Sequence, residues 1–206
     1  MSITSYEEFN ELHLDILREI GNIGAGNAAT ALSQLLDRRI TLAPPMVRLI
    51  PLHEISNALG GPENMVVGIL CELSGEIQGM MMFVLEQSFI HQIISQLLHK
   101  EISSYEDLGD MDFSALREIG NIMVGSFTTA MASLTGLRVG LDVPGIAIDM
   151  AGAIMNVPAA AFGTLGDYAF FIEEDILEGN QQLKSRLLLI PTLESLNRIM
   201  QSLGLE

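Results

Sequence analysis

The sequence predicts an α+β fold: one internally duplicated, pseudo-twofold domain with an antiparallel or mixed β-sheet, two long helices and additional helices. The heptapeptide Leu-Arg-Glu-Ile-Gly-Asn-Ile occurs twice, at residues 17–23 and again 99 positions later at 116–122. Around each copy, apolar residues recur with the period of an amphipathic helix, and each half also holds two apolar runs joined by a turn, as in a β-hairpin. Neither half would cover its sheet edges and helix faces alone, so we expect a single domain over residues 1–206.

Composition restricts the class of protein. The 206 residues carry a net charge of −16, and an acidic surface repels phosphate backbones, so we expect no nucleic acid partner. The single cysteine, Cys71, allows no intrachain disulfide and lies in an apolar run, as a buried thiol does. The N-terminal segment does not resemble a signal peptide, and no uncharged apolar run is long enough to span a membrane. We therefore expect a cytoplasmic protein without membrane insertion.

The first repeat, at about residues 5–99, begins with the first long helix. Ser5 to Glu8 has the form of a capping box, which predicts a helix from there to about Leu36. Its apolar stripe is predicted to consist of Phe9, Leu12, Ile16, Ile20 and Ile23. The remaining predicted elements are strands at 40–42 and 46–49, a short helix or loop at 53–64, hairpin strands at 65–73 and 77–85, and a helix at 87–98.

A polar, acidic segment at about 99–111 is predicted to link this repeat to the second one, at about 112–206. The same order of elements then returns. We expect a long helix at 112–135, strands at 137–141 and 145–150, a small apolar segment at 151–162, hairpin strands at 168–176 and 183–190, and a closing helix at 193–203. The loop of the second hairpin, residues 177–182, is expected to be longer than the turn of the first.

Each long helix is expected to present one polar stripe opposite its apolar face. The first stripe consists of Asp15, Glu19, Asn22 and Gly26, and the second of Ser114, Glu118, Asn121 and Gly125. Positions i, i+4, i+7 and i+11 of a helix lie along one side. In a single copy such residues would be read as ordinary solvated positions, but the same stripe in both halves favours a functional interpretation.

Glycines inside a helix need a reason, because each is about 1 kcal/mol less favourable than alanine. We expect another backbone to approach Gly21, Gly24 and Gly26, either from a neighbouring helix of this protein or from a docked partner. A phosphate-binding loop is disfavoured because this run lies within an amphipathic helix, and no Gly-Lys-Ser/Thr follows. In the second copy, Phe127 replaces Ala28, which predicts a different surface shape.

An exposed Glu and Asn three positions apart can act on a phosphorylated partner. Asn both donates and accepts hydrogen bonds without adding charge, so it can hold a water near a phosphoryl anion, and Glu can pair with a partner lysine. Positioning of this kind contributes much of the catalysis of phosphoryl transfer. The four histidines show no metal-ligand spacing, so no metal site is predicted. Asp149, in an apolar run, is either a carboxylate at the rim of a strand or a partner contact.

The two stripes resemble the pattern of the CheC phosphatases of bacterial chemotaxis, within the CheC/CheX/FliY group. That pattern is Asp or Ser, three residues, Glu, two residues, Asn, twenty-two residues, Pro. The chain carries it as Asp15, Glu19, Asn22 and Pro45, and again as Ser114, Glu118, Asn121 and Pro144. The resemblance covers essentially the whole chain in length and element order.

The resemblance implies hydrolysis of the aspartyl phosphate of the response regulator CheY. Asn22 and Asn121 would orient the attacking water, and Glu19 and Glu118 would hold the regulator. The protein would need no cofactor of its own, because the regulator would supply Mg²⁺. The resemblance also implies CheD, a receptor-modifying deamidase, as a second partner. The alternative is a non-catalytic module that only docks the regulator or CheD in the chemotaxis or flagellar switch system.

Overall fold

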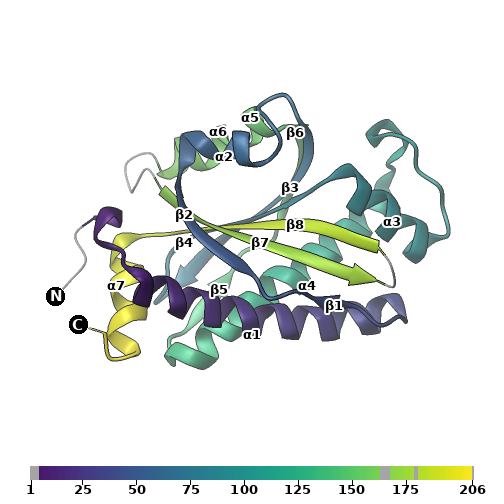
Figure 1. Ribbon diagram of the computed structural model, residues 1–206. Coiled ribbons are helices and arrows are strands. Elements are labelled where there is room, and N and C mark those ends of the chain that lie inside the picture. The colour runs from purple at the N-terminus through teal and green to yellow at the C-terminus, as the bar shows by residue number, and fades with distance from the viewer. Residues whose placement is uncertain (1–4, 163–167, 179–180, 206) are drawn as a thin grey trace.

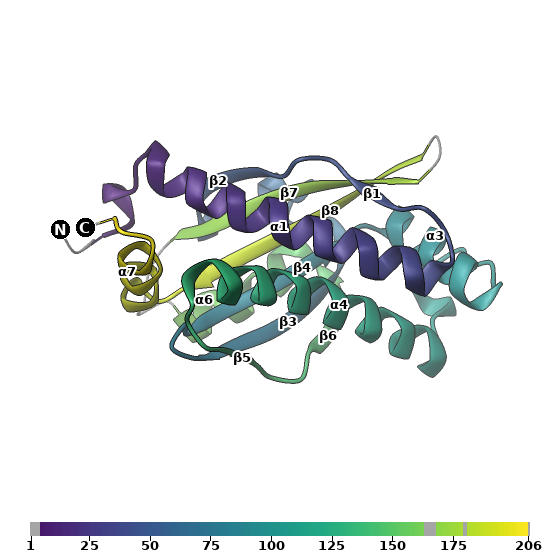
Figure 2. The same ribbon diagram turned by 90° about the horizontal axis from the view of Figure 1, so that it is seen from below.

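A computed structural model describes residues 5–162, 168–178 and 181–205. Its centre is a curled eight-stranded sheet in the order β1-β7-β8-β4-β3-β5, with β2 also paired to β7 and β6 to β3. Two long helices, α1 and α4, lie side by side across one face, and α2, α5 and α6 lie on the other (Figures 1 and 2). Helices α3 and α7 lie at opposite ends of the sheet (Figure 1). The α+β class predicted from the sequence is confirmed.

The elements follow the predicted order in both halves. The first half contains α1 (Glu11–Leu36), β1 (Thr41–Leu42), β2 (Met46–Pro51), α2 (Leu52–Ala58), β3 (Met65–Gly75), β4 (Gly79–Leu85) and α3 (Gln87–Leu98). The second contains α4 (Asp110–Thr135), β5 (Val139–Leu141), β6 (Gly145–Met150), α5 (Ala151–Ile154), α6 (Asn156–Phe162), β7 (Tyr168–Glu178), β8 (Gln181–Pro191) and α7 (Leu193–Ser202). Two 3-10 turns, η1 (Tyr6–Glu8) and η2 (Tyr105–Asp107), precede the long helices.

Strands of the two halves pair with each other in one sheet. The hairpin strands β4 and β8 pair with each other at the centre, and every pairing in the sheet is antiparallel. Strand β2 of the first half pairs with β7 of the second, and β6 of the second pairs with β3 of the first. Because each half satisfies backbone groups of the other, separating them would expose unpaired sheet edges.

Both faces of the sheet are covered by apolar side chains. On β4, Met81 and Phe83 face the cluster under the long helices, whereas Met82 and Val84 face a smaller cluster under α2 and α5. All seven residues of β4 are buried, as expected of a central strand covered on both sides. The long helices therefore rest on a sheet whose central strand is packed on both faces.

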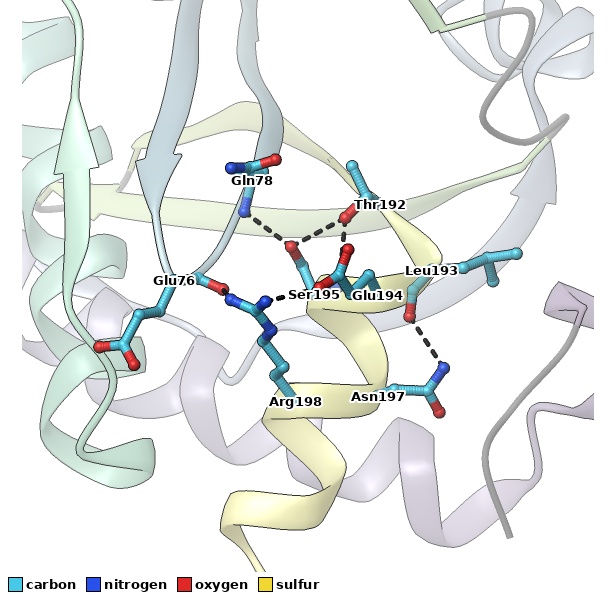
Figure 3. A network of polar contacts seen from close by, with 8 residues as sticks. All are labelled: Glu76, Gln78, Thr192, Leu193, Glu194, Ser195, Asn197 and Arg198. Carbon is cyan, nitrogen blue, oxygen red and sulfur yellow. Dashed lines mark hydrogen bonds and ion pairs between the residues drawn. The ribbon is translucent and has the colours of Figure 1, made fainter.

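A polar network ties the last helix to the first hairpin (Figure 3). The backbone N–H of Gln78, just before β4, donates to the buried Ser195 hydroxyl at 2.7 Å, and Thr192 caps α7 by accepting from the Ser195 backbone N–H at 3.1 Å. Arg198 also donates to the Glu76 carbonyl oxygen at 3.2 Å. A helix of the second half is thus fixed to a turn of the first, which adds to the strand pairing between the halves.

The start of the first helix differs from the sequence prediction. Residues 6–8 form only a 3-10 turn, and the Ser5 side chain makes no capping hydrogen bond. The α-helix begins at Glu11, where the Asn10 side chain accepts from the His13 backbone N–H and the His13 side chain accepts from the Asn10 N–H. A capping box is present, but Asn10 supplies it in place of Ser5.

The apolar stripe predicted for this helix is wrong in part. Leu12 is 54% exposed, and Phe9 precedes the helix and packs against the Phe170 ring instead. The buried line is centred on Leu17, Ile20 and Ala28 together with glycines. Small residues belong to the buried face here because a second helix approaches closely, so the spacing of the large apolar residues alone does not mark that face.

The predicted long loop at 177–182 is also wrong. Leu177 pairs with Gln182 and Glu178 with Gln181, so β7 and β8 include these four positions, and residues 179–180 lie outside the described part of the chain. Residue polarity marks where a core ends, but backbone hydrogen bonds can extend a hairpin beyond it.

Candidate functional site

The polar stripes lie on the outer faces of α1 and α4, as the spacing predicted. Glu19 and Asn22 on α1 and Glu118 and Asn121 on α4 are all exposed. None of these four side chains makes a hydrogen bond or ion pair with any residue that the structure describes. Each stripe is held outward because the intervening residues, such as Ile20 and Ile119, are buried against the sheet. Both helices therefore offer an unengaged carboxylate and carboxamide to an approaching molecule.

The glycines of the first helix divide into two kinds. A Cβ at Gly21 would lie 3.1 Å from Pro45 Cγ, and one at Gly24 would lie 3.1 Å from the Phe127 Cα of the neighbouring long helix. Internal packing therefore explains these two. A Cβ at Gly26, or at its counterpart Gly125, would meet nothing within 4 Å. At these two positions nothing in the described part of the protein excludes a side chain.

Phe127 does not change the surface of the second copy, contrary to the prediction. It is 1% exposed and packs with Phe83 at a ring-centroid distance of 6.0 Å. Phe127 instead packs against Gly24 of α1, where an added Cβ would lie 3.0 Å from the Phe127 Cγ. The difference between the copies at this position lies in the buried contact between the helices.

The first residues of the two stripes differ in their contacts. Asp15 is exposed but pairs with Arg18, which also lies 3.4 Å from Glu11. In the second copy, Ser114 is exposed and the counterpart of Arg18, Arg117, makes no ion pair with any described residue.

An open groove of about 430 Å³ lies between the long helices beside the second stripe. Its lining residues come from both helices: Asn27 and Ala31 of α1, and Asn121, Ile122, Gly125, Ser126 and Thr129 of α4. Asn121 and Gly125, both selected from the sequence, thus share a surface with Asn27, which sequence reasoning missed. The signal available in the sequence was small, since Asn27 is matched by Ser126 in the repeat.

Asp149 lies apart from the helical stripes. It is on β6, opposite Val66 of β3, and its exposed carboxylate accepts a hydrogen bond from the neighbouring Met150 N–H at 2.7 Å. The structure thus places it on an exposed strand, next to the start of α5 at Ala151. Whether it contacts a partner stays a prediction.

Metal-ligating side chains do not gather at either stripe. No group of three or more His, Cys, Asp or Glu residues is arranged to hold a metal ion within residues 5–162, 168–178 and 181–205. Two of the histidines have local roles: His13 accepts from Asn10, and His91 lies 3.2 Å from the Gln87 side chain.

The fold and the paired stripes define a class of protein with two Glu–Asn motifs on adjacent helices. The CheC-like family model matches residues 12–48 and 111–148, which contain the two stripes, and the chain belongs to this family. The CheY-P phosphatase CheC of Bacillus subtilis (strain 168) is 34% identical over 203 residues, covering 97% of this chain and 97% of the relative.

A second curated relative agrees with this assignment, and a solved structure shares the fold. The flagellar motor switch phosphatase FliY of Bacillus subtilis (strain 168) is 31% identical over 143 residues, covering 69% of this chain and 37% of the relative. The crystal structure of Thermotoga maritima FliY is similar in fold, with a TM-score of 0.76 and 22% identity over 95% of this chain and 98% of that one. In the described residues, no helix is both long enough and apolar enough to cross a membrane.

Proposed function

We propose that this protein is a phosphatase that hydrolyses the aspartyl phosphate of a CheY-type response regulator. The observation that carries the proposal is the pair of outward-facing, unengaged carboxamides, Asn22 and Asn121, each one turn from an exposed glutamate. Relatives at 34% and 31% identity bear the names CheY-P phosphatase and flagellar motor switch phosphatase.

In this mechanism each asparagine orients the attacking water toward the phosphorus atom. An asparagine carboxamide accepts a hydrogen bond from the water and donates another, and it adds no negative charge near the phosphoryl oxygens. Because positioning makes a large contribution to phosphoryl transfer, one such group per site is a sufficient contribution from this protein. The regulator brings the acyl phosphate and its own Mg²⁺.

The glutamates hold the regulator. Glu19 and Glu118 are exposed, so each can reach a lysine beside the phosphorylated aspartate of the partner. Such a pair becomes desolvated on docking and then contributes more than it would on an open surface. Asp15 and Ser114, at the start of each stripe, would contact the partner at the edge of the same surface.

Gly26 and Gly125 would let the regulator backbone approach the helix. Both lie on the stripe, one turn after the asparagine, and no described residue is close enough to either to exclude a side chain. A helix that carries glycine at an open position gives up about 1 kcal/mol relative to alanine, and close docking is a physical reason for it.

CheD is proposed as a second partner that uses another surface. Asp149 is exposed on β6 and belongs to neither long helix, so a protein bound there would leave both stripes open. Replacing Asp149 with Lys should weaken CheD binding, measured by calorimetry, without slowing dephosphorylation by this protein alone.

Removing both carboxamides tests the catalytic proposal. Asn22→Ala combined with Asn121→Ala should lower the accelerated decay of phosphorylated regulator by about a hundredfold or more, because the water loses its orientation. Binding of the regulator should survive, since the glutamates remain. The measurement is the decay of phosphorylated CheY with and without the protein, paired with a binding assay.

The matched control is Gln34→Ala, which removes an exposed polar side chain from the same helix three turns beyond Asn22. This variant should behave like the unaltered protein. Undiminished acceleration by the double asparagine variant would exclude the mechanism and favour a docking module that has no catalysis of its own.

A further inference from the structure

The arginine that precedes each glutamate is in a different state in the two repeats. Arg18 is held on the surface of α1 by Asp15 and by Glu11, the latter at 3.4 Å. In α4 the counterparts of these acids are Ser114, which has no charge, and Asp110, whose side chain is one methylene shorter. Arg117 is exposed and unpaired within the described residues.

The residue that approaches each asparagine from the opposite long helix differs as well. The groove beside Asn121 includes Asn27, which comes across from the other long helix, is exposed and makes no hydrogen bond with the described residues. We call the surroundings of Asn22 the first site and those of Asn121 the second site. Ser126 of α4 is equivalent to Asn27 in the repeat, so it is the residue expected to approach the first site from the opposite helix. Its hydroxyl donates to the Ile122 carbonyl oxygen of its own helix at 2.7 Å, so its single donor is already used.

We infer that Arg117 and Asn27 contact the phosphoryl group at the second site, an inference that rests on the proposed function. At the first site the equivalent residues, Arg18 and Ser126, are already engaged in contacts of their own helices. Arg117 lies one turn before Asn121 on the same side of α4, and the groove containing Asn27 extends from Asn121 in the other direction. A phosphoryl group attacked at Asn121 therefore lies between a guanidinium and a second carboxamide.

The chemistry of the two groups fits this ligand. A guanidinium offers five N–H donors in a planar fork and matches phosphoryl oxygens, and the carboxamide of Asn27 adds two more donors. Neither group is needed for internal structure, because neither contacts a described residue through a polar bond. At the first site, Arg18 would have to leave two acidic partners before it could bind an anion.

The test isolates each site. In the Asn22→Ala background only the second site can work, and in the Asn121→Ala background only the first. Asn27→Ala and Arg117→Gln should each slow phosphatase turnover about tenfold or more in the first background, as expected for a lost hydrogen bond to a charged group. In the second background, the loss should be at least fivefold smaller. Arg117→Lys should recover part of the rate, because it keeps the charge without the fork.

Two further readouts separate a phosphoryl contact from a general surface effect. Asn27→Asp has the same shape but a negative charge, so it should be slower than Asn27→Ala in the Asn22→Ala background. Arg117→Gln should weaken binding of the regulator loaded with the phosphoryl mimic beryllofluoride more than binding of the unphosphorylated regulator. The unfolding midpoints of these variants should match that of the parent.

Equal losses in the two backgrounds would overturn the inference, as would unchanged turnover in both or equal weakening of both forms of the regulator. These outcomes would leave the proposed function intact. Failure of the proposed function itself is recognised separately, by full activity in the variant that lacks both Asn22 and Asn121.

Discussion

The two repeats carry the same exposed Glu–Asn pair but differ where their long helices meet. On the outside, α1 and α4 present the same Glu–Asn pair, and none of the four side chains makes a polar contact within the part of the chain that the structure describes. On the inside, Gly24 of α1 faces the larger Phe127 of α4. Two helices that both carried a large residue at this contact would clash, and two that both carried a small residue would leave a void, because a protein interior is closely packed. Duplication preserved the exposed pattern, whereas the buried contact became complementary.

Phe127→Ala should break the inner contact most strongly. Phe127 is fully buried and packs with Phe83, so its removal leaves a cavity and should lower the free energy of unfolding by about 3–5 kcal/mol. Urea denaturation measures the change. The matched outer variant is Asn121→Ala, which should change stability by about 0.5 kcal/mol or less. Similar losses for the two variants would contradict the division between an inner packed face and an outer free one.

A second contrast lies in the sheet, at equivalent positions of the two hairpins. Leu49 and Ile148 are equivalent in the repeat, and their strand partners are Phe170 and Val67. Val67 is therefore equivalent to Phe170, and four residues further along each strand Cys71 is equivalent to Glu174. Both are buried, and burial raises the pKa of the Cys71 thiol to about 11 and that of the Glu174 carboxyl to about 8. The thiol is therefore neutral across the physiological range, whereas the carboxyl must bind a proton when the protein folds near pH 7.

Stability should accordingly fall with rising pH because of Glu174. Its folded pKa of about 8 lies above the ordinary value of 4.5, so its contribution is complete below pH 4.5 and is lost as pH rises through about 8. Within that window the slope approaches about 1.4 kcal/mol per pH unit. Urea unfolding at pH 5, 6, 7 and 8 should show this slope in the unaltered protein and a flatter one in Glu174→Gln. Parallel curves for the two proteins would show that the carboxyl is not protonated in the folded state.

The smallest expected effect separates the two kinds of glycine. Gly26→Ala and Gly125→Ala should each raise the free energy of unfolding by up to about 1 kcal/mol, because alanine favours the helix and nothing lies within 4 Å. The same variants should weaken regulator docking. Gly21→Ala serves as the control, since its Cβ would lie 3.1 Å from Pro45 Cγ and the gain should be reduced or reversed. If Gly26→Ala and Gly125→Ala bound the regulator as tightly as the unaltered protein, close docking would not explain why glycine occupies these positions.

Much of the architecture could be predicted from local patterns. The repeat, the hairpins and the helix Gln87–Leu98 follow from periodicities that each segment carries by itself, and the structure has them in that order. The outward direction of Glu19 and Asn22 followed in the same way, since helical spacing determines which residues share a side. The roles of these residues stay predictions until the variants are measured.

Contacts between distant segments could not be predicted in this way. Nothing local to β2 specifies β7 as its partner, and nothing local to Gly24 specifies Phe127. Asn27 joins the second groove only because the two long helices lie side by side. The sequence by itself determined a doubled polar stripe on two helices, because side-chain periodicity is a property of each helix alone. The tertiary structure alone decided which residues cross between the long helices, because that outcome depends on how separate helices pack.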